Sequence, residues 1–281
     1  MKKIAIWTNE RGDRLPVTRE VISVLRTFCE KIYVQDPCGA LAIEGVKTYG
    51  EDRFPKEAEM LLVLGGDGTM LRAAQTALRH DVPLMGINMG RLGYLASVER
   101  SEISLLSALA SDAFVEKQHM ILEVSLSARE GETPLGYALN DVVVDGGGHL
   151  ADIRLYDGDS YLDYRADGLI VATPTGSTAY SFSAGGPVMD EGMDAICVTP
   201  VCPRSFFSRS LLFSSESSLT VQNRSERIEN LDISIDGHIH FSLMEGSSIV
   251  VRRAEKRVCI LSLKERNLLE VLCTKMDTHH F

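Results

Sequence analysis

The stretch Met60-Leu61-Leu62-Val63-Leu64-Gly65-Gly66-Asp67-Gly68-Thr69 is the most informative one for the fold of the first half of the chain. Its apolar run predicts a buried strand, and the two glycines that follow allow a tight turn that presents bare backbone N–H groups. Gly68 lets Asp67 project from the turn. The following segment, Met70–Arg79, has helical spacing, and a helix N-terminus favours anions. A strand, a glycine turn and a helix in this order predict a phosphate site.

Asp67 is the unusual member of this turn. A carboxylate beside a phosphate site repels its ligand unless it takes a proton from an attacking hydroxyl or holds a divalent cation. The alternative is an ordinary strand-to-helix turn in which Asp67 is the N-cap of the helix. The turn by itself leaves both interpretations open.

Strands and helices alternate through the first hundred residues. Apolar runs predict strands at Lys3–Thr8, Ile32–Gln35 and Pro83–Asn88, and apolar residues from Val17 to Ile32 recur at helical spacing. Because each strand is apolar on both sides, the pattern predicts a parallel sheet covered on both faces. In such sheets ligands bind at the carboxyl ends of the strands.

The pattern changes from about Gln118 to many short strands with few helices, which predicts a mostly β second half. A helix over Glu99–Ser111 is expected to connect the halves, and Lys264–Thr274 is again helical in pattern. The prediction is an α/β domain over residues 1–98, a β-rich domain over 99–261, and a C-terminal helix within 262–281 that returns to the first domain. The strands expected in the second domain are Met120–Leu126, Leu139–Val144, Ile153–Tyr156, Ser160–Tyr164, Gly168–Ala172, Leu219–Gln222, Ile233–Ile235 and Ile249–Arg253.

Composition excludes several classes of function. The 281 residues carry 29 Lys plus Arg against 39 Asp plus Glu, a formal net charge of −10, which gives no basic footprint for nucleic acid or an anionic membrane. No apolar run approaches the roughly 20 residues of a membrane span. The six scattered cysteines form no C-x-x-C pair, so we expect reduced thiols and a cytoplasmic location.

A second polar segment, DGLIVATPTGSTAYS over Asp167–Ser181, ends an apolar strand in small and hydroxylated residues. Hydroxyl groups offer donors and acceptors to a polar ligand, Gly176 permits close approach, and Tyr180 offers its ring to a base. A Ser/Thr-rich turn before the Gly-Gly-Pro at 185–187 is the less specific interpretation. The hydroxyl groups belong to Thr175, Ser177, Thr178 and Ser181.

With these motifs in place, the sequence resembles the NAD kinases of the bacterial short-chain ATP/polyphosphate type. The resemblance rests on GGDGT at 65–69, GINMGRLGYL at 86–95, LND at 139–141 and the block at 167–187, in the order of the family. Diacylglycerol, sphingosine and 6-phosphofructo kinases share a turn like the first motif, so the threonine-rich block is the specific one. The resemblance implies a Rossmann-like α/β domain, a β-rich domain, NAD in the cleft between them, and a homodimer or homotetramer that completes the site.

The resemblance also implies roles for residues of the first domain. Asp67 matches the acid that activates the 2′-hydroxyl of the adenosine ribose of NAD for attack on the terminal phosphate of ATP. Gly68 would lie against the dinucleotide, and Arg72, one helical turn on, would face a phosphate. No residue is assigned as a metal ligand. Mg²⁺ or Mn²⁺ is expected to bridge the donor phosphates, because an acid beside a triphosphate needs a cation.

In the second domain the resemblance implies a set of dinucleotide contacts. Asn140 and Asp141 match the Asn-acid pair that binds ribose or adenine edges, while Asp167 and Arg165 approach the nicotinamide half. His238 stands where the family usually has Gln. The residues expected to line the adenine and ribose pocket are Thr178, Ala179, Tyr180, Ser181 and Ser183.

The leading hypothesis is therefore phosphoryl transfer from ATP, or from polyphosphate, to NAD, with Asp67 as the base and NAD and ATP as the small-molecule partners. One alternative is a lipid or sugar kinase with the same turn, which would need an apolar acceptor channel or a sugar-phosphate clamp. Another is a non-catalytic sensor that binds NAD or NADP and regulates a partner. The sequence leaves open NAD versus NADH, the donor, feedback by NADP, and the oligomeric state.

Overall fold

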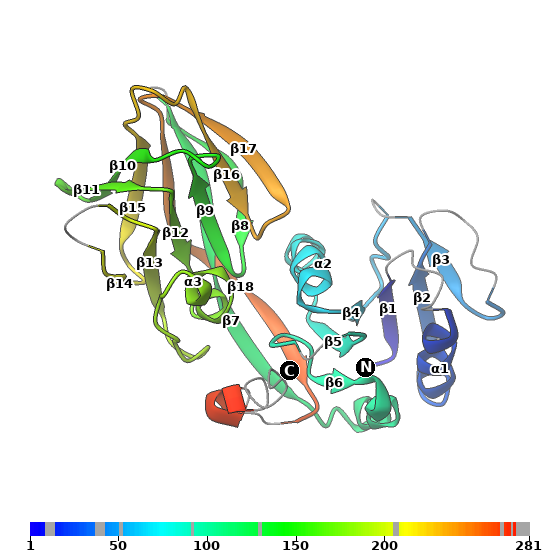
Figure 1. The fold of residues 1–281 in the computed structure, drawn as a ribbon. Helices are drawn as coiled ribbons and strands as arrows, with labels where there is room; N and C mark the ends of the chain where they lie inside the picture. The colour runs from blue at the N-terminus through cyan, green and yellow to red at the C-terminus, as the bar shows by residue number, and fades with distance from the viewer. Residues whose placement is uncertain are drawn as a thin grey trace. The chain divides into compact units, whose positions relative to one another are not determined.

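The structure is a computed structural model that describes residues 1–8, 15–36, 43–50, 53–90, 93–128, 131–204, 208–264, 267–270 and 272–273. The chain folds into two compact units, Met1–Gln118 with Val258–Phe281, and His119–Arg257 (Figure 1). The first is α/β and the second is almost entirely β, as the sequence predicts. No helix in the described part of the chain is long and apolar enough to cross a membrane.

The first unit is built on a parallel sheet with the strand order β5-β4-β1-β2-β3. The chain moves outward from β1 to β3 and then returns to the other side of β1 with β4. The order therefore reverses between β1 and β4, and ligands of such sheets bind outside the carboxyl ends at the reversal. The strands are β1 (Lys3–Thr8), β2 (Lys31–Gln35), β3 (Lys47–Tyr49), β4 (Met60–Gly65) and β5 (Leu84–Asn88).

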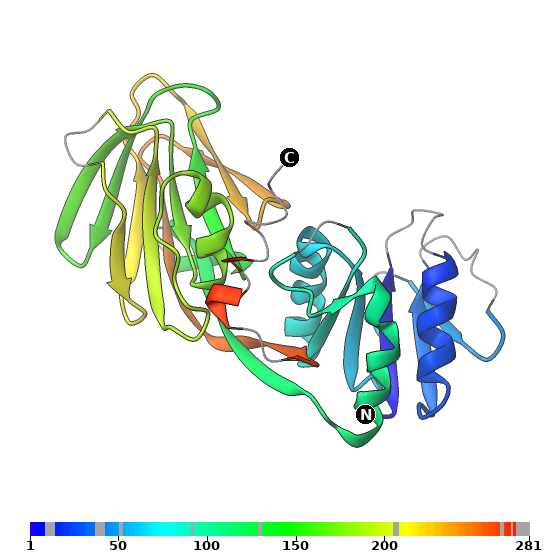
Figure 2. The ribbon, with the colours of Figure 1, turned by 60° about the horizontal axis from the view of Figure 1, so that its bottom comes forward.

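Helices cover both faces of this sheet. Helix α1 (Leu15–Leu25) and the 3₁₀ helix η2 (Arg100–Ser111) lie side by side (Figure 2) and share one core with β1, β4 and β5. Helix α2 (Asp67–His80) packs on the other face. Its Met70 lies so close to Gly86 of β5 that a Cβ on Gly86 would stand 2.7 Å from the Met70 sulfur. The sheet is covered on both sides as its apolar strands require.

Two helix predictions need correction. The apolar spacing that runs to Ile32 overstates α1, which ends at Leu25, and Ile32 belongs to β2. The Thr27 hydroxyl donates to the Val24 carbonyl, one of the carbonyl groups at the C-terminal end of the helix that have no partner within it. The spacing of apolar residues does not reveal where the helix ends. The connecting helix begins at Arg100 and is 3₁₀, in keeping with buried residues that recur every three positions. These residues are Ile103, Leu106 and Leu109.

The predicted helix Lys264–Thr274 falls partly outside the described residues. Residues 268–270 and 272–273 are helical. The short strand β6 (Val98–Glu99) pairs in parallel with β5, and the far end of the long strand β18 (Ser248–Ser262) joins β5 through Ile260 and Leu84. The C-terminal segment thus returns to the sheet of the first unit as a strand.

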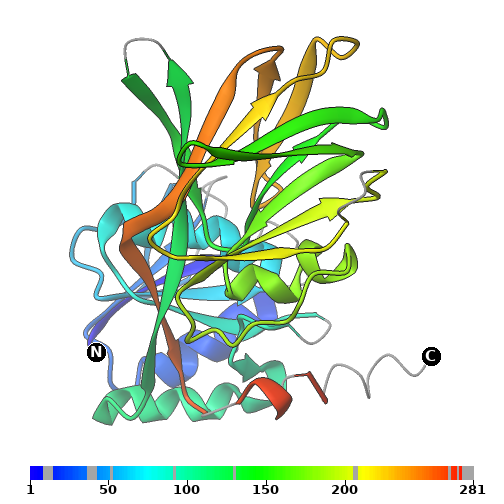
Figure 3. The ribbon, with the colours of Figure 1, turned by 90° about the vertical axis from the view of Figure 1, so that its left-hand side faces the viewer.

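The second unit packs two antiparallel sheets around one core (Figure 3). One sheet has the order β14-β13-β12-β9-β16-β17, and the other joins β11, β10, β15 and β18 with the hairpin β7–β8. Apolar residues from the inward faces of both sheets form this core, as in a β-sandwich. The bounds are β7 Val115–Ala128, β8 Gly131–Ala138, β9 Asp141–Asp145, β10 Ala151–Asp157, β11 Ser160–Ala166, β12 Gly168–Ala172, β13 Ala195–Val201, β14 Leu211–Ser214, β15 Ser218–Asn223, β16 Asn230–Ile235 and β17 Ile239–Met244.

Candidate active site

The glycine turn follows β4, whose six residues are all buried. A Cβ on Gly65 would stand 2.4 Å from the Cβ of Thr69, so only glycine lets the strand and helix approach this closely. Thr69 lies inside α2 and is 5% exposed, and its hydroxyl does not cap the helix. The N-cap is Gly66, which leaves the first N–H groups of the helix without a side-chain cap.

The carboxylate of Asp67 binds a distant segment of the same unit. Its Oδ2 accepts the backbone N–H of Tyr94 at 2.8 Å, and its Oδ1 accepts that of Leu95 at 3.1 Å. Asp67 is the first residue of α2, the N-cap is Gly66, and no side-chain cap bond is present at this end of the helix. The N-cap interpretation of Asp67 is therefore wrong. Burial and, to a smaller extent, the charge of Asp67 raise the pKa of the Tyr94 hydroxyl.

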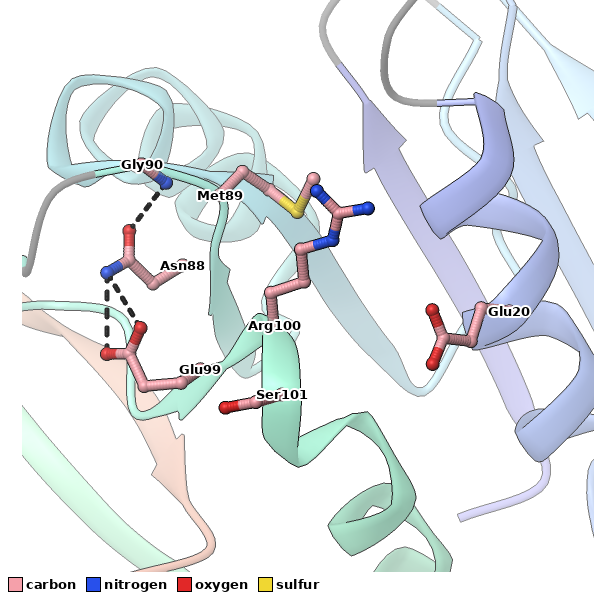
Figure 4. A pocket seen from close by; sticks show the side chains of 7 residues that line it. All are labelled: Glu20, Asn88, Met89, Gly90, Glu99, Arg100 and Ser101. Atoms are coloured by element: carbon pink, nitrogen blue, oxygen red, sulfur yellow. Dashed lines mark hydrogen bonds between the residues drawn. The ribbon is translucent and has the colours of Figure 1, made fainter.

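The loop that reaches Asp67 is anchored where it leaves β5 (Figure 4). The Asn88 amide, 2% exposed, donates to Glu99 Oε2 at 3.1 Å and accepts the Gly90 N–H at 3.1 Å. An open pocket of about 580 Å³ lies beside these groups. In this view the Arg100 side chain extends toward the Met89 side chain. The pocket is lined by Glu20, Asn88, Met89, Gly90, Glu99, Arg100 and Ser101.

The other two predicted residues of the first unit, Gly68 and Arg72, are exposed on α2. Gly68 is exposed in the first turn, and a Cβ on it would meet no heavy atom within 4 Å. Arg72 is exposed one turn further along the same helix. Both are accessible to a ligand in solution.

In the second unit, Asp236 organises the turn that carries Asn140 and Asp141. Its carboxylate accepts three backbone N–H groups, from Leu139 at 2.9 Å, Asn140 at 2.7 Å and Asp141 at 3.1 Å. Asp236 itself has φ +50, in the left-handed region, which non-glycine residues adopt rarely. The sequence does not reveal this role of Asp236, because the turn lies about a hundred positions earlier in the chain.

The threonine-rich block is attached to the same turn. The Thr173 hydroxyl donates to the Leu139 carbonyl at 2.6 Å, and the Thr173 N–H donates to the Asn140 carbonyl at 2.9 Å. A Cβ on Gly176 would stand 2.0 Å from the Asn140 carbonyl oxygen. The two motifs that the sequence analysis assigned to the dinucleotide are thus brought together within this unit.

Within the block, several hydroxyls are used locally. After β12 the chain forms a 3₁₀ turn (η3, Thr175–Thr178) and a short helix (α3, Tyr180–Ser183). The Thr178 hydroxyl donates to the Thr175 carbonyl, and the fully buried Ser181 hydroxyl bonds that of Thr199 at 3.0 Å. Tyr180 is 42% exposed and Ser183 is exposed, whereas Thr178 and Ala179 are half-buried.

Three further predicted residues lie at the edges of this region. Asp167 is exposed, and its backbone N–H donates to the Val201 carbonyl. The Arg165 guanidinium lies 3.8 Å from the Asp152 carboxylate, and both side chains are exposed. His238 Nδ1 lies 3.1 Å from the Asp236 carbonyl, so it belongs to the same turn as the Asp236 carboxylate. A buried histidine that the sequence analysis did not single out, His119, joins β7 to Thr175 at 2.9 Å.

Burial and, second, the neighbouring Asp236 charge raise the pKa of Asp141 to about 7. Burial also raises the pKa of Asp236, although its three N–H donors oppose this shift and favour Asp236 as the charged member of the pair. At neutral pH the Asp141 carboxyl is thus close to its midpoint. It can donate a hydrogen bond when protonated and accept one when ionised.

This shift predicts how stability depends on pH. The pKa of Asp141 is higher in the folded protein, about 7, than the ordinary value of 3.8, so the folded state keeps a proton that the unfolded state loses. The contribution of Asp141 to the free energy of unfolding should fall as pH rises from about 4 to about 7. Asp141→Asn should remove this fall. Relative to wild type, its free energy of unfolding should therefore increase by on the order of a few kcal/mol between pH 4 and 8.

Urea unfolding of both proteins across that pH range measures the difference. Asp232→Asn is the matched control, because Asp232 is exposed on the neighbouring strand β16. The difference in the free energy of unfolding between Asp232→Asn and wild type should stay constant with pH. An Asp141→Asn difference that is equally constant would contradict the assignment.

Models of known protein families match two long segments of the chain. A family model for the ATP-NAD kinase N-terminal domain matches residues 5–112, and one for the C-terminal domain matches residues 139–263. The chain belongs to the ATP-NAD kinase family. The predicted family and the predicted phosphotransferase are confirmed, and the NAD kinase interpretation is supported over a lipid or sugar kinase or a non-catalytic sensor.

Curated relatives match along the whole length. The chain is 34% identical to an NAD kinase of Geobacter sulfurreducens over 98% of both chains. It is 30% identical to an NAD kinase of Natranaerobius thermophilus, again over 98% of both. Among solved structures, a yeast NADH kinase complexed with NADH superposes with a TM-score of 0.84 at 22% identity, over 100% of this chain and 89% of that one.

An NAD kinase from Archaeoglobus fulgidus in complex with ATP superposes with a TM-score of 0.70 at 23% identity, over 99% of both chains. At this level of identity the two solved structures establish the fold. The predicted combination of an α/β part and a β-rich part is therefore confirmed by the topology and by these neighbours.

Proposed function

We propose that this chain transfers the terminal phosphate of ATP to the 2′-hydroxyl of the adenosine ribose of NAD, which yields NADP and ADP. The observation that carries the proposal is the Asp67 carboxylate, which projects from an uncapped helix start after a glycine turn. Among the structural neighbours, one protein is complexed with NADH and another with ATP, and both substrate classes fit this reaction.

In the proposed reaction Asp67 accepts the proton of the 2′-hydroxyl. The ribose oxygen forms a bond to the γ-phosphorus, the bond from that phosphorus to the β–γ bridging oxygen breaks, and ADP leaves with the electron pair. Positioning of the reactants and neutralisation of charge supply most of the reduction in the activation barrier in such transfers. The first N–H groups of α2, which have no side-chain cap, would supply part of that neutralisation.

The dinucleotide contacts follow the family resemblance. Gly68 would lie against the dinucleotide and Arg72 would face a phosphate, since both are exposed on α2. Ser181 would support α3 through its bond to Thr199, because its hydroxyl is fully buried. The remaining proposed contacts are Asn140, Asp141, Arg165, Asp167, Thr178, Ala179, Tyr180, Ser183 and His238.

A divalent cation, Mg²⁺ or Mn²⁺, would enter with the nucleotide. Among the described residues there is no group of three or more His, Cys, Asp or Glu side chains arranged to hold a metal ion. We expect the donor phosphates to carry the ion, because Mg²⁺ commonly keeps its waters and binds through one or two carboxylates plus substrate phosphates. The cation would neutralise charge on the donor phosphates.

We also propose a cytoplasmic location and a homodimer or homotetramer. The location rests on the thiols: the cysteines in the described regions are free, as a reducing compartment keeps them. The oligomer rests on the family resemblance. Light scattering on the purified full chain gives the assembly mass directly, and a monomer would contradict the second proposal.

An assay of product formation tests the function. The purified chain is incubated with NAD, ATP and Mg²⁺, and NADP is measured by an NADP-specific dehydrogenase. NADP should accumulate with ATP consumption in a one-to-one ratio. Parallel reactions with NADH or with polyphosphate establish the acceptor and the donor. Saturable binding of NAD without any NADP would instead support a sensor.

A further inference from the structure

The two oxygens of the Asp67 carboxylate are held by one short segment of backbone, Gly93–Leu95, which we call the cradle. Tyr94 and Leu95 donate their N–H groups to Oδ2 and Oδ1 at 2.8 Å and 3.1 Å. Hydrogen bonds to a charged acceptor are stronger than neutral ones, and two of them from successive residues fix both side-chain torsions of Asp67. Each oxygen keeps a further lone pair that can accept a proton.

The third residue of the cradle contributes space. A Cβ on Gly93 would stand 2.3 Å from Asp67 Oδ1 and 3.1 Å from Asp67 Cγ. Backbone conformation does not require glycine there, because Gly93 is not among the glycines with positive φ. Any other residue at position 93 would therefore adopt the backbone but displace the carboxylate.

The surrounding fold keeps the cradle in place. Just after it, Ala96 packs against Gly86 of β5, where a Cβ would stand 2.8 Å from the Ala96 Cα. The chain then enters β6, which pairs Val98 with Ile87 of β5. The cradle is thus tied to the same sheet that carries the glycine turn, so its N–H groups and Asp67 share one rigid support.

We propose that Gly93 is a positioning residue for the reaction: its missing side chain leaves the space in which the Tyr94 and Leu95 N–H groups hold the Asp67 carboxylate in its reactive orientation. This rests on the proposed role of Asp67 as the base. The displaced group is the far end of a side chain that can rotate away, so a larger residue at 93 should disturb catalysis more than folding.

The test compares Gly93→Ala with Gly50→Ala. A Cβ on Gly50, directly after β3, meets no heavy atom within 4 Å among the described residues, so this change adds the same methyl group to the same unit, away from the candidate site and without contact. For Gly93→Ala, kcat should fall by roughly 10²-fold, the loss that a displacement of about 1 Å can cause. Its KM for NAD and its melting temperature should stay close to wild type, and Gly50→Ala should match wild type throughout.

Equal kcat values for the two variants would overturn the proposal, as would a loss in Gly93→Ala that appears only in KM or in melting temperature. The Asp67→Asn variant separates this outcome from failure of the proposed function. An inactive Asp67→Asn with a fully active Gly93→Ala refutes the cradle alone. An active Asp67→Asn refutes the role of Asp67 itself.

A second measurement covers the case in which Gly93→Ala does not fold. In an Asp67→Ala background the carboxylate is absent, and the added methyl group has room. Gly93→Ala should then cost less stability than it does with Asp67 in place, because residues in contact do not behave additively. Equal destabilisation in both backgrounds would show that position 93 does not act through Asp67.

Discussion

Replacement of Asp67 by asparagine is expected to lower kcat by roughly 10²–10⁴-fold, the range that a positioned general base contributes. Asparagine keeps the shape of the side chain and one oxygen that can accept an N–H from Tyr94 or Leu95, but its amide takes no proton from the 2′-hydroxyl. Turnover should therefore be lost while NAD binding persists. Steady-state kinetics and calorimetric titration with NAD measure the two quantities separately.

Asp81→Asn is the control for this experiment. Asp81 ends the same helix in a left-handed conformation with φ 53, which asparagine adopts readily, and it is exposed. This variant should keep wild-type kcat and stability. Wild-type turnover in Asp67→Asn would exclude Asp67 as the base.

Replacement of Gly176 by alanine is expected to damage both the fold of the second unit and NAD binding. The new Cβ would stand 2.0 Å from the carbonyl oxygen and 2.4 Å from the carbonyl carbon of Asn140, and neither backbone atom can rotate away. Overpacking of a close contact costs on the order of 1–3 kcal/mol, and we expect the upper end here. The displaced Asn140 should also raise the dissociation constant for NAD.

Urea unfolding and NAD titration measure the two effects of Gly176→Ala. Gly192→Ala is the matched control, because its Cβ would approach only the carboxylate end of Asp190, at 3.2 Å. The control should leave stability and binding near wild type. A Gly176→Ala protein that binds NAD as wild type does would contradict the proposal that the threonine-rich block and Asn140 form one dinucleotide site.

Strands with a strong local pattern could be predicted from the sequence. The run Met60–Leu64 is apolar without interruption and forms β4, and the alternation from Met120 places β7 correctly. Strands with weak patterns were missed. β3 has only three residues, and β8 contains Pro134 and two glycines, which depress any strand signal. The strands β13, β14 and β17 were also absent from the prediction.

The candidate site divides in the same way. Asp67, the Asn140–Asp141 pair and the threonine-rich block are recognisable because each is a short local motif. Their partners are not recognisable, because Tyr94 lies 27 positions from Asp67 and Asp236 lies 96 positions from Asn140. The pKa of Asp141 depends likewise on burial that only the folded chain creates.

Local sequence patterns predict the alternation of the principal strands and helices in the first unit, the β-rich character of the second, and the motifs that carry the chemistry. These follow from side-chain periodicity and from residue types over a few neighbouring positions. The partners of the Asp67 carboxylate, and the close contacts that leave no room for a side chain at positions 93 and 176, are visible only in the folded chain. Those facts depend on close contacts between segments distant in the chain, and no local pattern encodes such distances.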